Sequence, residues 1–214
     1  MRRIPHLYLP PPWPEGPVVP PSTTVRHLRV VLRLADGASV TYTDGRGTMG
    51  TGRWIDGAVD RGDEQHVDDP SPLVLAVAPP RRMERLRFVV EKLAELGVPM
   101  LRWLVAERAQ ARLPRADKVQ AWAIGALQQS RGAHLLDVSG PVGWSELPRP
   151  LVVAQPGGRP LVGVAPPATI AIGPEGGFSS AEIPPDAERV DLGERILRVE
   201  TAALVAAAAM LVGR

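Results

Sequence analysis

The residues with the clearest chemical signature lie in two glycine-rich segments near the C-terminal end. Residues 172–179 read Ile-Gly-Pro-Glu-Gly-Gly-Phe-Ser, and residues 192–203 read Leu-Gly-Glu-Arg-Ile-Leu-Arg-Val-Glu-Thr-Ala-Ala. Glycine lets backbone N–H and C=O groups approach a ligand closely, because no side chain intervenes. Each segment follows a short apolar run typical of a buried strand. Together they predict one ligand pocket, beside which Arg195, Arg198, Glu200 and Thr201 form a dense polar cluster.

These segments do not match the common nucleotide-binding or hydrolase motifs. The chain contains neither the phosphate loop G-x-x-x-x-G-K-[ST] nor the nucleophile elbow G-x-S-x-G. Pro174 lacks the backbone N–H that a phosphate cradle needs, so the turn suits a nucleoside-like ligand better than a polyphosphate. The four histidines are not at ligand spacing and there is no cysteine, so we expect no metal site.

An alternation of strands and helices must position the two segments. Apolar runs predict strands over 73–78, 100–105, 151–154, 169–172 and 189–192, and helical spacing predicts helices over 83–96, 116–130 and 201–212. This alternation is typical of a mostly parallel α/β sheet, in which ligands bind at the carboxyl ends of the strands. The turns after Ala154, Ile172 and Leu192 all lie at such ends. The last helix is apolar nearly all round, so something must enclose it.

The first 70 residues predict a separate small domain. Residues 10–14 are rich in proline and should be extended, and a helix should begin near Thr23 with Ser22 as its N-cap. Strands over 39–43 and 50–55 flank a hairpin turn at 44–47 and favour a small barrel, whose last strand could pass through the polar stretch 60–70.

The predicted helix in this domain has two distinct faces. Its apolar face comprises Val25, Leu28, Val31 and Leu32. Its basic face comprises Arg26, Arg29 and Arg33. This basic stripe is either an RNA-backbone contact or an ordinary solvated face.

The overall composition is consistent with an RNA-binding protein of the cytoplasm. The 214 residues are 44% apolar, which supports a real core. No uninterrupted apolar run reaches about 18 residues, so we expect no membrane span. The lack of cysteine favours the cytoplasm. The net charge is only +2, but nearly all basic residues are arginine, whose planar fork binds phosphates. A GC-rich genome would produce the same excess of arginine over lysine.

Taken together, the two glycine-rich segments resemble the bacterial family that methylates N3 of a uridine in 16S rRNA. That family belongs to the SPOUT class of knotted methyltransferases. The resemblance extends to segments 91–98, 106–108 and 128–131 and to the helix at 25–33, so it covers both predicted domains in the family's order. The chain departs from the family pattern at Arg26, Pro79, Pro80, Ala109, Gln128 and Val199.

The resemblance implies an α/β fold with two domains. Residues 71–214 would form a SPOUT trefoil-knot domain with a mostly parallel sheet, and residues 1–70 a PUA-like RNA-binding β-barrel. It also implies S-adenosyl-L-methionine as cofactor, a homodimer with the pocket near its interface, and 16S rRNA, free or in the assembled small subunit, as substrate. In such a dimer, the knot and the second subunit would enclose the last helix.

The resemblance also assigns residues to roles. The expected cofactor-binding residues are Val153, Ala154, Ile172, Gly173, Pro174, Glu175, Gly176, Gly177, Leu192, Gly193, Ile196, Leu197, Arg198, Thr201 and Ala202. The expected RNA-binding residues are Arg3, His6, Arg26, His27, Arg29, Arg33, Arg81, Arg82 and Arg85.

Methyl transfer from a sulfonium needs no covalent enzyme intermediate, so the difficulty lies in the proton on uracil N3. We expect Arg198 to stabilise negative charge that develops on the uracil carbonyls. Glu200 has three open roles: it accepts the proton, it orients Arg198, or it favours the N-terminus of the last helix. Glu175 is similarly open. Positioning of the uracil alone could supply much of the rate.

Two other functions remain open. A knotted methyltransferase that acts on a ribose 2′-hydroxyl or on tRNA would use the same cofactor loops. The first-domain helix and segment 95–98, however, resemble the uridine-N3 family specifically. An RNA-binding ribosome-assembly factor without catalysis is the second possibility. It would show no saturable site for the cofactor.

Overall fold

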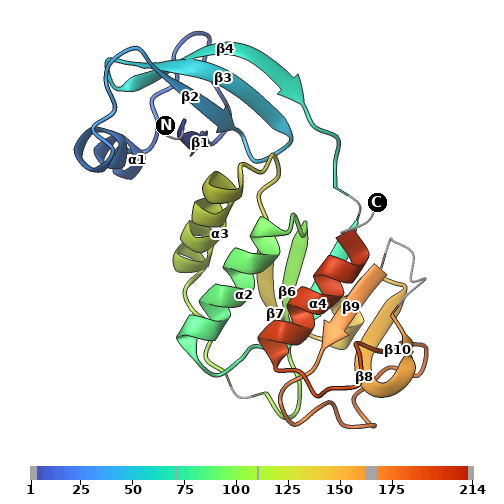
Figure 1. Ribbon diagram of the computed structural model, residues 1–214. Helices are drawn as coiled ribbons and strands as arrows, with labels where there is room; N and C mark the ends of the chain where they lie inside the picture. The colour runs from blue at the N-terminus through green and yellow to red at the C-terminus, as the bar shows by residue number, and fades with distance from the viewer. Residues whose placement is uncertain (1–3, 71, 110, 162–167, 212–214) are drawn as a thin grey trace. The chain divides into compact units, whose positions relative to one another are not determined.

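The computed structural model describes residues 4–70, 72–109, 111–161 and 168–211, which divide into two compact units. The N-terminal unit contains the residues up to Asp69 together with Leu127–Leu135. The C-terminal unit contains the rest of the chain (Figure 1). Sequence patterns did not indicate that Leu127–Leu135 packs with the N-terminal residues.

The N-terminal unit is built on a four-stranded sheet in the order β1-β2-β3-β4. β1 (His6–Tyr8) is parallel to β2 (Ala38–Thr43), and β3 (Thr48–Ile55) and β4 (Ala58–His66) follow as antiparallel hairpins. The predicted turn at 44–47 is held by Asp44, whose Oδ1 accepts hydrogen bonds from the backbone N–H groups of Arg46 and Thr48. Residues 60–66 of the polar stretch 60–70 belong to β4. They lack apolar periodicity because none of them is buried.

The core of this unit forms around aromatic side chains of the sheet. Tyr42 and Trp54 are buried there with Leu7, Leu9 and Val59. Trp13, from the proline-rich segment, packs edge-on against Tyr42 with ring centroids 5.5 Å apart. The extended proline segment therefore serves as a cover for the sheet.

The helix of this unit is shorter and less regular than the sequence predicts. α1 spans Ser22–Arg26, and the residue at its N-cap position is Pro21, not Ser22. The chain then continues as a π-helical turn, η1, over His27–Val31. Since a π turn has more residues per turn than an α-helix, side-chain spacing changes at this point.

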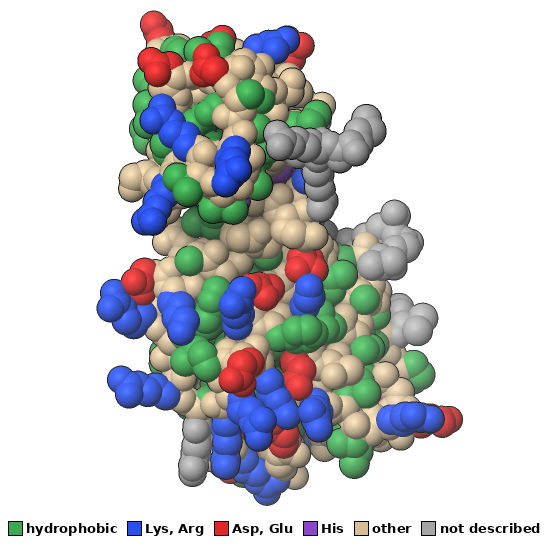
Figure 2. Space-filling view, turned by 60° about the vertical axis from the view of Figure 1, so that its left-hand side comes forward, with side chains coloured by type: hydrophobic (Ala, Val, Ile, Leu, Met, Phe, Trp, Pro, Cys, Tyr) green, Lys and Arg blue, Asp and Glu red, His purple; other side chains and the backbone are tan. Residues whose placement is uncertain are grey.

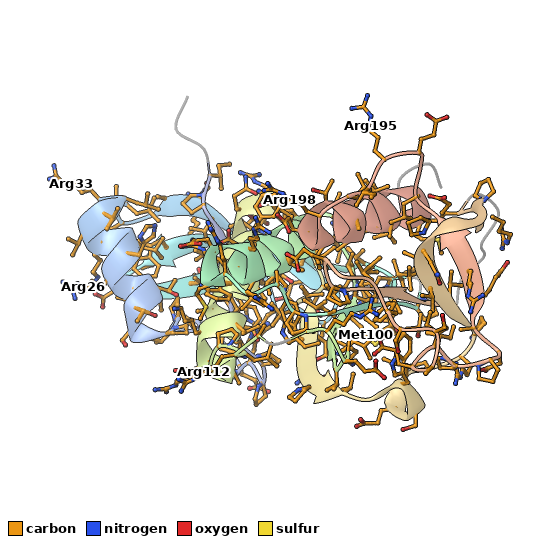
Figure 3. The ribbon with its side chains drawn as sticks, turned by 90° about the horizontal axis from the view of Figure 1, so that it is seen from below. Arg26, Arg33, Met100, Arg112, Arg195 and Arg198 are labelled. Carbon is orange, nitrogen blue, oxygen red and sulfur yellow. The ribbon has the colours of Figure 1, made fainter. Side chains whose placement is uncertain are left out.

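The π turn overturns the predicted apolar face. Leu28 is buried, but Val31 and Leu32 are 65% and 41% exposed. Arg33 lies beyond η1 with a φ of 47°, so Arg26, Arg29 and Arg33 do not lie along one regular helix. Figure 3 shows Arg26 and Arg33 leaving this segment at separate points.

His6, at the start of β1, is a further correction. The prediction places it in contact with RNA, but the residue is only 6% exposed. Its Nδ1 lies 2.8 Å from Thr41 Oγ1, and its Nε2 lies 3.3 Å from the carbonyl oxygen of Gly132. Burial lowers the pKa of His6; the Gly132 contact partly opposes this, and the charge of Arg131 adds to it. Both ring nitrogens are therefore engaged inside the unit.

This burial predicts an acid sensitivity of the N-terminal unit. The pKa of His6 is lower in the folded state than in the unfolded state. Its contribution to the free energy of unfolding is therefore fully present above the ordinary histidine pKa, and it is lost as the pH falls through the lowered native pKa. We expect the melting temperature to fall as the pH drops below the ordinary histidine pKa of about 6.5, and His6→Gln to flatten this fall. Thermal unfolding at a series of pH values measures it. His27→Gln, at an exposed histidine, should leave the pH dependence as it is; the same slope in His6→Gln would contradict the assignment.

The C-terminal unit is a six-stranded sheet in the order β10-β8-β9-β5-β6-β7. Every neighbouring pair is parallel, which confirms the predicted α/β class. The strands are β5 (Leu73–Val77), β6 (Met100–Leu104), β7 (Asp137–Val142), β8 (Leu151–Pro160), β9 (Ala168–Ile172) and β10 (Glu188–Asp191). The helices are α2 (Met83–Glu95), α3 (Ala116–Ser130), the short 3-10 helix η2 (Trp144–Glu146) and α4 (Val199–Leu211).

Two strands differ from the sequence prediction. β7 was not predicted, because this edge strand has no buried residue and contains Gly140 and Pro141. β8 continues to Pro160 instead of ending at Ala154. Its pairing with β10 jumps from Val153 opposite Arg189 to Arg159 opposite Val190, so residues 154–158 bulge out of the ladder. The predicted glycine turn is this bulge.

The two faces of the sheet are covered differently. α2 and α4 pack against each other, and α4 contacts β5 and β9; Figure 1 shows both helices on the same side of the sheet. On the other face, Ala76, Val153 and Ala171 pack with side chains from the connections, including Trp144 and Ile183. This double cover explains the continuous apolar strand sequences.

α4 is the nearly all-apolar helix noted in the sequence. Its residues Val199, Ala202, Ala203, Ala206, Ala207 and Met210 are buried. Thr201, Val205 and Ala209, spaced four residues apart, remain exposed as one strip. None of the described helices is long and apolar enough to cross a membrane.

Candidate active site

A cavity of about 350 Å³ opens at the bulge within β8 and at the ends of β9 and β10. This volume lies in the usual range for small-molecule sites. The predicted residues that line it are Ala154, Ile172, Gly173, Pro174, Glu175, Gly176, Gly177, Leu192, Gly193, Ile196, Leu197 and Ala202. The glycine-rich segments predicted to share one pocket therefore do so.

Other residues of the cavity wall were not predicted. They are Gln155, Pro156, Phe178, Asp191, Arg195 and Val199. Asp191, Arg195 and Val199 lie inside or beside the glycine-rich segments and could have been included on proximity. Gln155 carried no local signal, because only the bulge in β8 brings it to the wall.

Three predicted cofactor residues do not line the cavity. Val153 is fully buried in β8, beneath the wall. Arg198 and Thr201 are exposed at the start of α4. The described wall near α4 is formed instead by Leu197, Val199 and Ala202.

The loop after β9 is held by contacts with the segment after β6. The Nη1 of Arg108 donates to the carbonyl oxygen of Gly176 at 2.6 Å. The two carboxylate oxygens of Glu182 accept from the backbone N–H of Ser179 at 2.7 Å and of Glu107 at 2.9 Å. Glu182 thus joins two loops that lie far apart in sequence and fixes the glycine-rich turn.

Phe178 and Gly173 form a close contact in the same loop. A Cβ added at Gly173 would lie 3.1 Å from the Phe178 ring. The Phe178 ring itself packs against Trp144, with centroids 4.8 Å apart. Because Gly173 has no side chain, the Phe178 ring, which packs on Trp144, can lie close to the backbone of the cavity wall.

Asp191 connects the other two turns. Its Oδ2 accepts from the backbone N–H of Gly157 at 2.8 Å, and its Oδ1 accepts from that of Gly193 at 3.0 Å. These hydrogen bonds, that from Gly157 first, lower the pKa of Asp191. Since both oxygens are engaged, Asp191 shapes the cavity and is not available as a general base.

The two candidate catalytic residues lie at the start of α4 and face different surroundings. Arg198 is exposed, and its guanidinium has no hydrogen bond or ion pair within the described part of the chain. Figure 3 shows Arg198 at the N-terminal end of α4, while Arg195 extends away from the preceding loop. Within the described chain, Arg198 is thus left without a side-chain partner, next to the wall residues Leu197 and Val199.

Glu200 is mostly buried, with 12% of its side chain exposed. Its Oε1 lies 3.4 Å from Arg85 Nε, and its Oε2 is buried without a hydrogen-bond partner. Of the roles left open for Glu200, orienting Arg198 has no contact behind it in the described chain, because the packing of α2 on α4 brings Arg85 to this carboxylate instead. Glu200 also lies in the first turn of α4, where a negative charge is favourable.

The predicted RNA-binding residues fall into three groups. Arg81 and Arg82, just before α2, and Arg26, His27, Arg29 and Arg33, in the N-terminal unit, are exposed. Arg85 is partly buried in ion pairs. Arg3 lies outside the described residues. Figure 2 shows basic side chains interspersed with acidic ones on the visible face, so charge alone does not outline an RNA path.

The cavity fits a nucleoside-like cofactor with amine and hydroxyl donors. Several of its walls are bare glycine backbone, which offers N–H and C=O groups to a ligand. In addition, Gln155 Oε1 is buried at the wall without a hydrogen-bond partner, and such an acceptor requires a donor. No group of three potential metal ligands lies together among the residues that the structure describes.

A parallel sheet with glycine-rich turns around a cofactor cavity, closed by a buried C-terminal helix, defines an RNA methyltransferase of the SPOUT class. Residues 67–211 match the family model of the RNA methyltransferase domain. The chain belongs to this family, which includes ribosomal RNA small subunit methyltransferase E. Comparison with the curated proteins finds no match.

Solved structures resemble the chain over nearly its whole length. Ribosomal RNA small subunit methyltransferase E of Neisseria gonorrhoeae, bound to S-adenosylmethionine, is 29% identical with a TM-score of 0.82, covering 97% of this chain and 96% of that one. A probable rRNA methyltransferase of Porphyromonas gingivalis is 26% identical with a TM-score of 0.82, covering 95% of each chain. A methyltransferase of Legionella pneumophila with bound S-adenosylmethionine is 27% identical with a TM-score of 0.80, covering 97% and 96%. The cofactor of this protein is S-adenosylmethionine.

The unpaired oxygen of Gln155 predicts a contribution to cofactor affinity. Gln155→Leu keeps most of the side-chain volume but removes the acceptor. We expect the dissociation constant of S-adenosylmethionine to rise about 5- to 10-fold, which corresponds to one hydrogen bond of about 1 kcal/mol. Isothermal titration calorimetry measures it. Gln120→Leu, on the exposed side of α3, serves as control, and unchanged binding in Gln155→Leu would show that the carbonyl has no role.

Proposed function

We propose that this protein transfers the methyl group of S-adenosylmethionine to N3 of a uridine in the 16S rRNA of the small ribosomal subunit. The observation that carries the proposal is the similarity to the small-subunit methyltransferase of Neisseria, which spans 97% of this chain and includes both compact units. A methyltransferase with another RNA target would need to match only the cofactor-binding unit.

The cofactor, when bound, supplies an electrophilic methyl group on a positively charged sulfur. The glycine-rich walls and Gln155 hold it by backbone and carbonyl groups. Arg198, which has no side-chain partner among the described residues, approaches the carbonyl oxygens of the uracil and stabilises the negative charge that develops as N3 loses its proton. Positioning of the uracil against the methyl supplies much of the remaining rate.

Two carboxylates line the cavity, and they differ as proton acceptors. Asp191 is engaged on both oxygens by backbone N–H groups. Glu175 is half-exposed, and its Oε1 pairs with Arg85 at 3.3 Å. Glu200 does not line the cavity and faces Arg85. We therefore assign the N3 proton to Glu175 or to water beside it, and a supporting role to Glu200.

RNA binding is assigned to exposed basic residues of each unit. Arg26, His27, Arg29 and Arg33 serve the PUA-like N-terminal domain, taken as residues 1–70, and Arg81 and Arg82 serve the catalytic domain, residues 71–214. Such phosphate contacts carry little sequence information and weaken with salt. Specificity comes from the folded rRNA or the assembled subunit, with the target base turned out of its stack. Since this substrate is part of the ribosome, the proposal places the protein in the cytoplasm.

We also propose a homodimer that covers α4 and the cavity rim. Ile196, at the cavity wall, is 92% exposed, and the strip of Thr201, Val205 and Ala209 leaves one side of an apolar helix open. A second copy placed here would bury both features. Sedimentation equilibrium should then give twice the chain mass of 23.0 kDa; a monomer at micromolar concentration would refute this part of the proposal.

Nucleoside mass spectrometry of 16S rRNA tests the proposed reaction. Ribosomes from cells without this protein should lack 3-methyluridine in 16S rRNA, and purified protein with S-adenosylmethionine should restore it. Intact 3-methyluridine together with loss of a 2′-O-methylated nucleoside or of a tRNA modification would assign a different substrate. Normal nucleosides with defective subunit assembly would indicate an assembly factor.

A further inference from the structure

Arg85 lies where three separate parts of the C-terminal unit meet. It belongs to α2, its Nη1 is 3.3 Å from Glu175 Oε1 in the loop after β9, and its Nε is 3.4 Å from Glu200 Oε1 at the start of α4. Its side chain is 26% exposed and thus partly buried, whereas Arg81 and Arg82 are exposed. One guanidinium thus connects two carboxylates that are 25 residues apart in the sequence.

Both carboxylates belong to segments that form the cofactor cavity. Glu175 lines it directly, and so do Val199 and Ala202, which lie on either side of Glu200 in the sequence. We propose that Arg85 is a positioning residue of the cofactor site, which fixes the glycine-rich loop against the start of α4, and that it is not an RNA contact. The proposal concerns S-adenosylmethionine binding and does not depend on which nucleotide is methylated.

Because Glu200 is mostly buried, its carboxylate depends on the ion pair with Arg85. Its Oε2 has no hydrogen-bond partner, so the ion pair with Arg85 is the interaction that compensates the buried charge in the described chain. Without Arg85, the carboxylate stays buried without a counter-charge or turns toward solvent, and an uncompensated buried charge is costly. Either outcome disturbs the first turn of α4 and the wall residues on it.

The loop side of the link depends on Arg85 for a different reason. Glu175 lies between Pro174 and the flexible pair Gly176 and Gly177, and its side chain is half-exposed. Arg108 holds the carbonyl of Gly176, Glu182 holds the backbone N–H of Ser179, and Arg85 holds the side chain of Glu175. Of these three contacts, only that of Arg85 also reaches the start of α4, so its loss separates the loop from this helix.

The alternative role, a contact with an RNA phosphate, makes opposite predictions. An RNA contact would use the guanidinium donors that the two carboxylates leave open, and its loss would lower RNA affinity and the salt dependence of that affinity. A positioning role leaves RNA binding unchanged and weakens the cofactor. Binding of S-adenosylmethionine in the absence of RNA separates the two.

Calorimetric titration of S-adenosylmethionine into single and double variants is the test. We expect Arg85→Ala to raise the dissociation constant about tenfold and Arg85→Lys to restore part of the affinity. Glu175→Gln and Glu200→Gln should each weaken binding by less, and adding either change to Arg85→Ala should cost nothing further, because the shared interaction is already lost. Non-additivity of this kind is not expected from a general loss of stability.

Matched variants complete the test. Arg87→Ala removes an exposed arginine that pairs with Glu91 on the same helix and should leave cofactor binding unchanged. Arg81→Ala should reduce the salt dependence of RNA binding by about one phosphate contact, whereas Arg85→Ala should not. The proposal is overturned if Arg85→Ala and Arg85→Lys bind the cofactor normally, if the effects of Arg85→Ala and Glu200→Gln simply add, or if Arg85→Ala changes only the RNA salt dependence.

Discussion

Arg198→Ala is expected to lower turnover on 16S rRNA by about 10²- to 10³-fold, while the dissociation constant of S-adenosylmethionine changes by less than about twofold. The guanidinium is exposed, has no partner within the described residues, and does not line the cavity, so the cofactor does not need it. The uracil does need it, because a proton must leave N3 and the charge must be shared with the carbonyl oxygens. Arg198→Lys keeps the charge without the planar fork and should be intermediate.

Single-turnover transfer of a labelled methyl group to 16S rRNA or to small subunits measures the chemical step. Arg115→Ala, which removes an exposed arginine paired with Asp117 near the start of α3, is the control and should react at the normal rate. If Arg198→Ala retains turnover but no longer binds S-adenosylmethionine, then Arg198 is a cofactor ligand and its catalytic assignment falls.

Gly158→Ala is expected to weaken cofactor binding far more than Gly157→Ala. A Cβ at Gly158 would lie 2.7 Å from the backbone carbons of Arg189 and Val190, so β10 would have to move away from β8. Overpacking of this kind costs about 1–3 kcal/mol. Because β10 leads directly into Asp191, Leu192 and Gly193 of the cavity wall, we expect an increase of about 10- to 100-fold in the dissociation constant of S-adenosylmethionine.

Gly157 provides the matched comparison one residue away. Its φ of 81° strains any other residue, but an added Cβ would meet no atom within 4 Å. Gly157→Ala should therefore lower stability by about 1–2 kcal/mol and leave the position of β10 unchanged. Chemical denaturation and calorimetric titration of both variants separate strain from displacement. Equal cofactor affinities would show that the β8–β10 contact does not shape the cavity.

Local sequence patterns were sufficient for the class of fold and for most of the cavity wall. The buried strand β5 appears as a continuous apolar run, because both of its faces are covered. The turns after β9 and β10 are rich in glycine, because the backbone itself forms the wall there. Both signals are determined within a few neighbouring residues, and a parallel sheet brings the carboxyl ends of its strands to one edge whatever the details of packing.

Interactions between distant residues were decided only by the tertiary structure. The pairing of Glu200 with Arg85 rather than Arg198 follows from the packing of α4 on α2, and the burial of His6 follows from the return of Leu127–Leu135 to the N-terminal unit. A charged side chain or a histidine looks the same in sequence whether it faces solvent or a partner far along the chain. Its role depends on which surfaces the fold brings together, and sequence spacing carries no information about that.

The same division applies to the two glycine-rich segments, residues 172–179 and 192–203. Their residue types determined that a nucleoside-like cofactor binds between them, because bare backbone and a proline that lacks an N–H suit such a ligand. Only the tertiary structure decided that Gln155 joins the wall through a bulge in β8, that Asp191 ties two of the turns together, and that Arg85 holds the third against α4. These contacts join residues from separate strands and helices, and their geometry is set by packing.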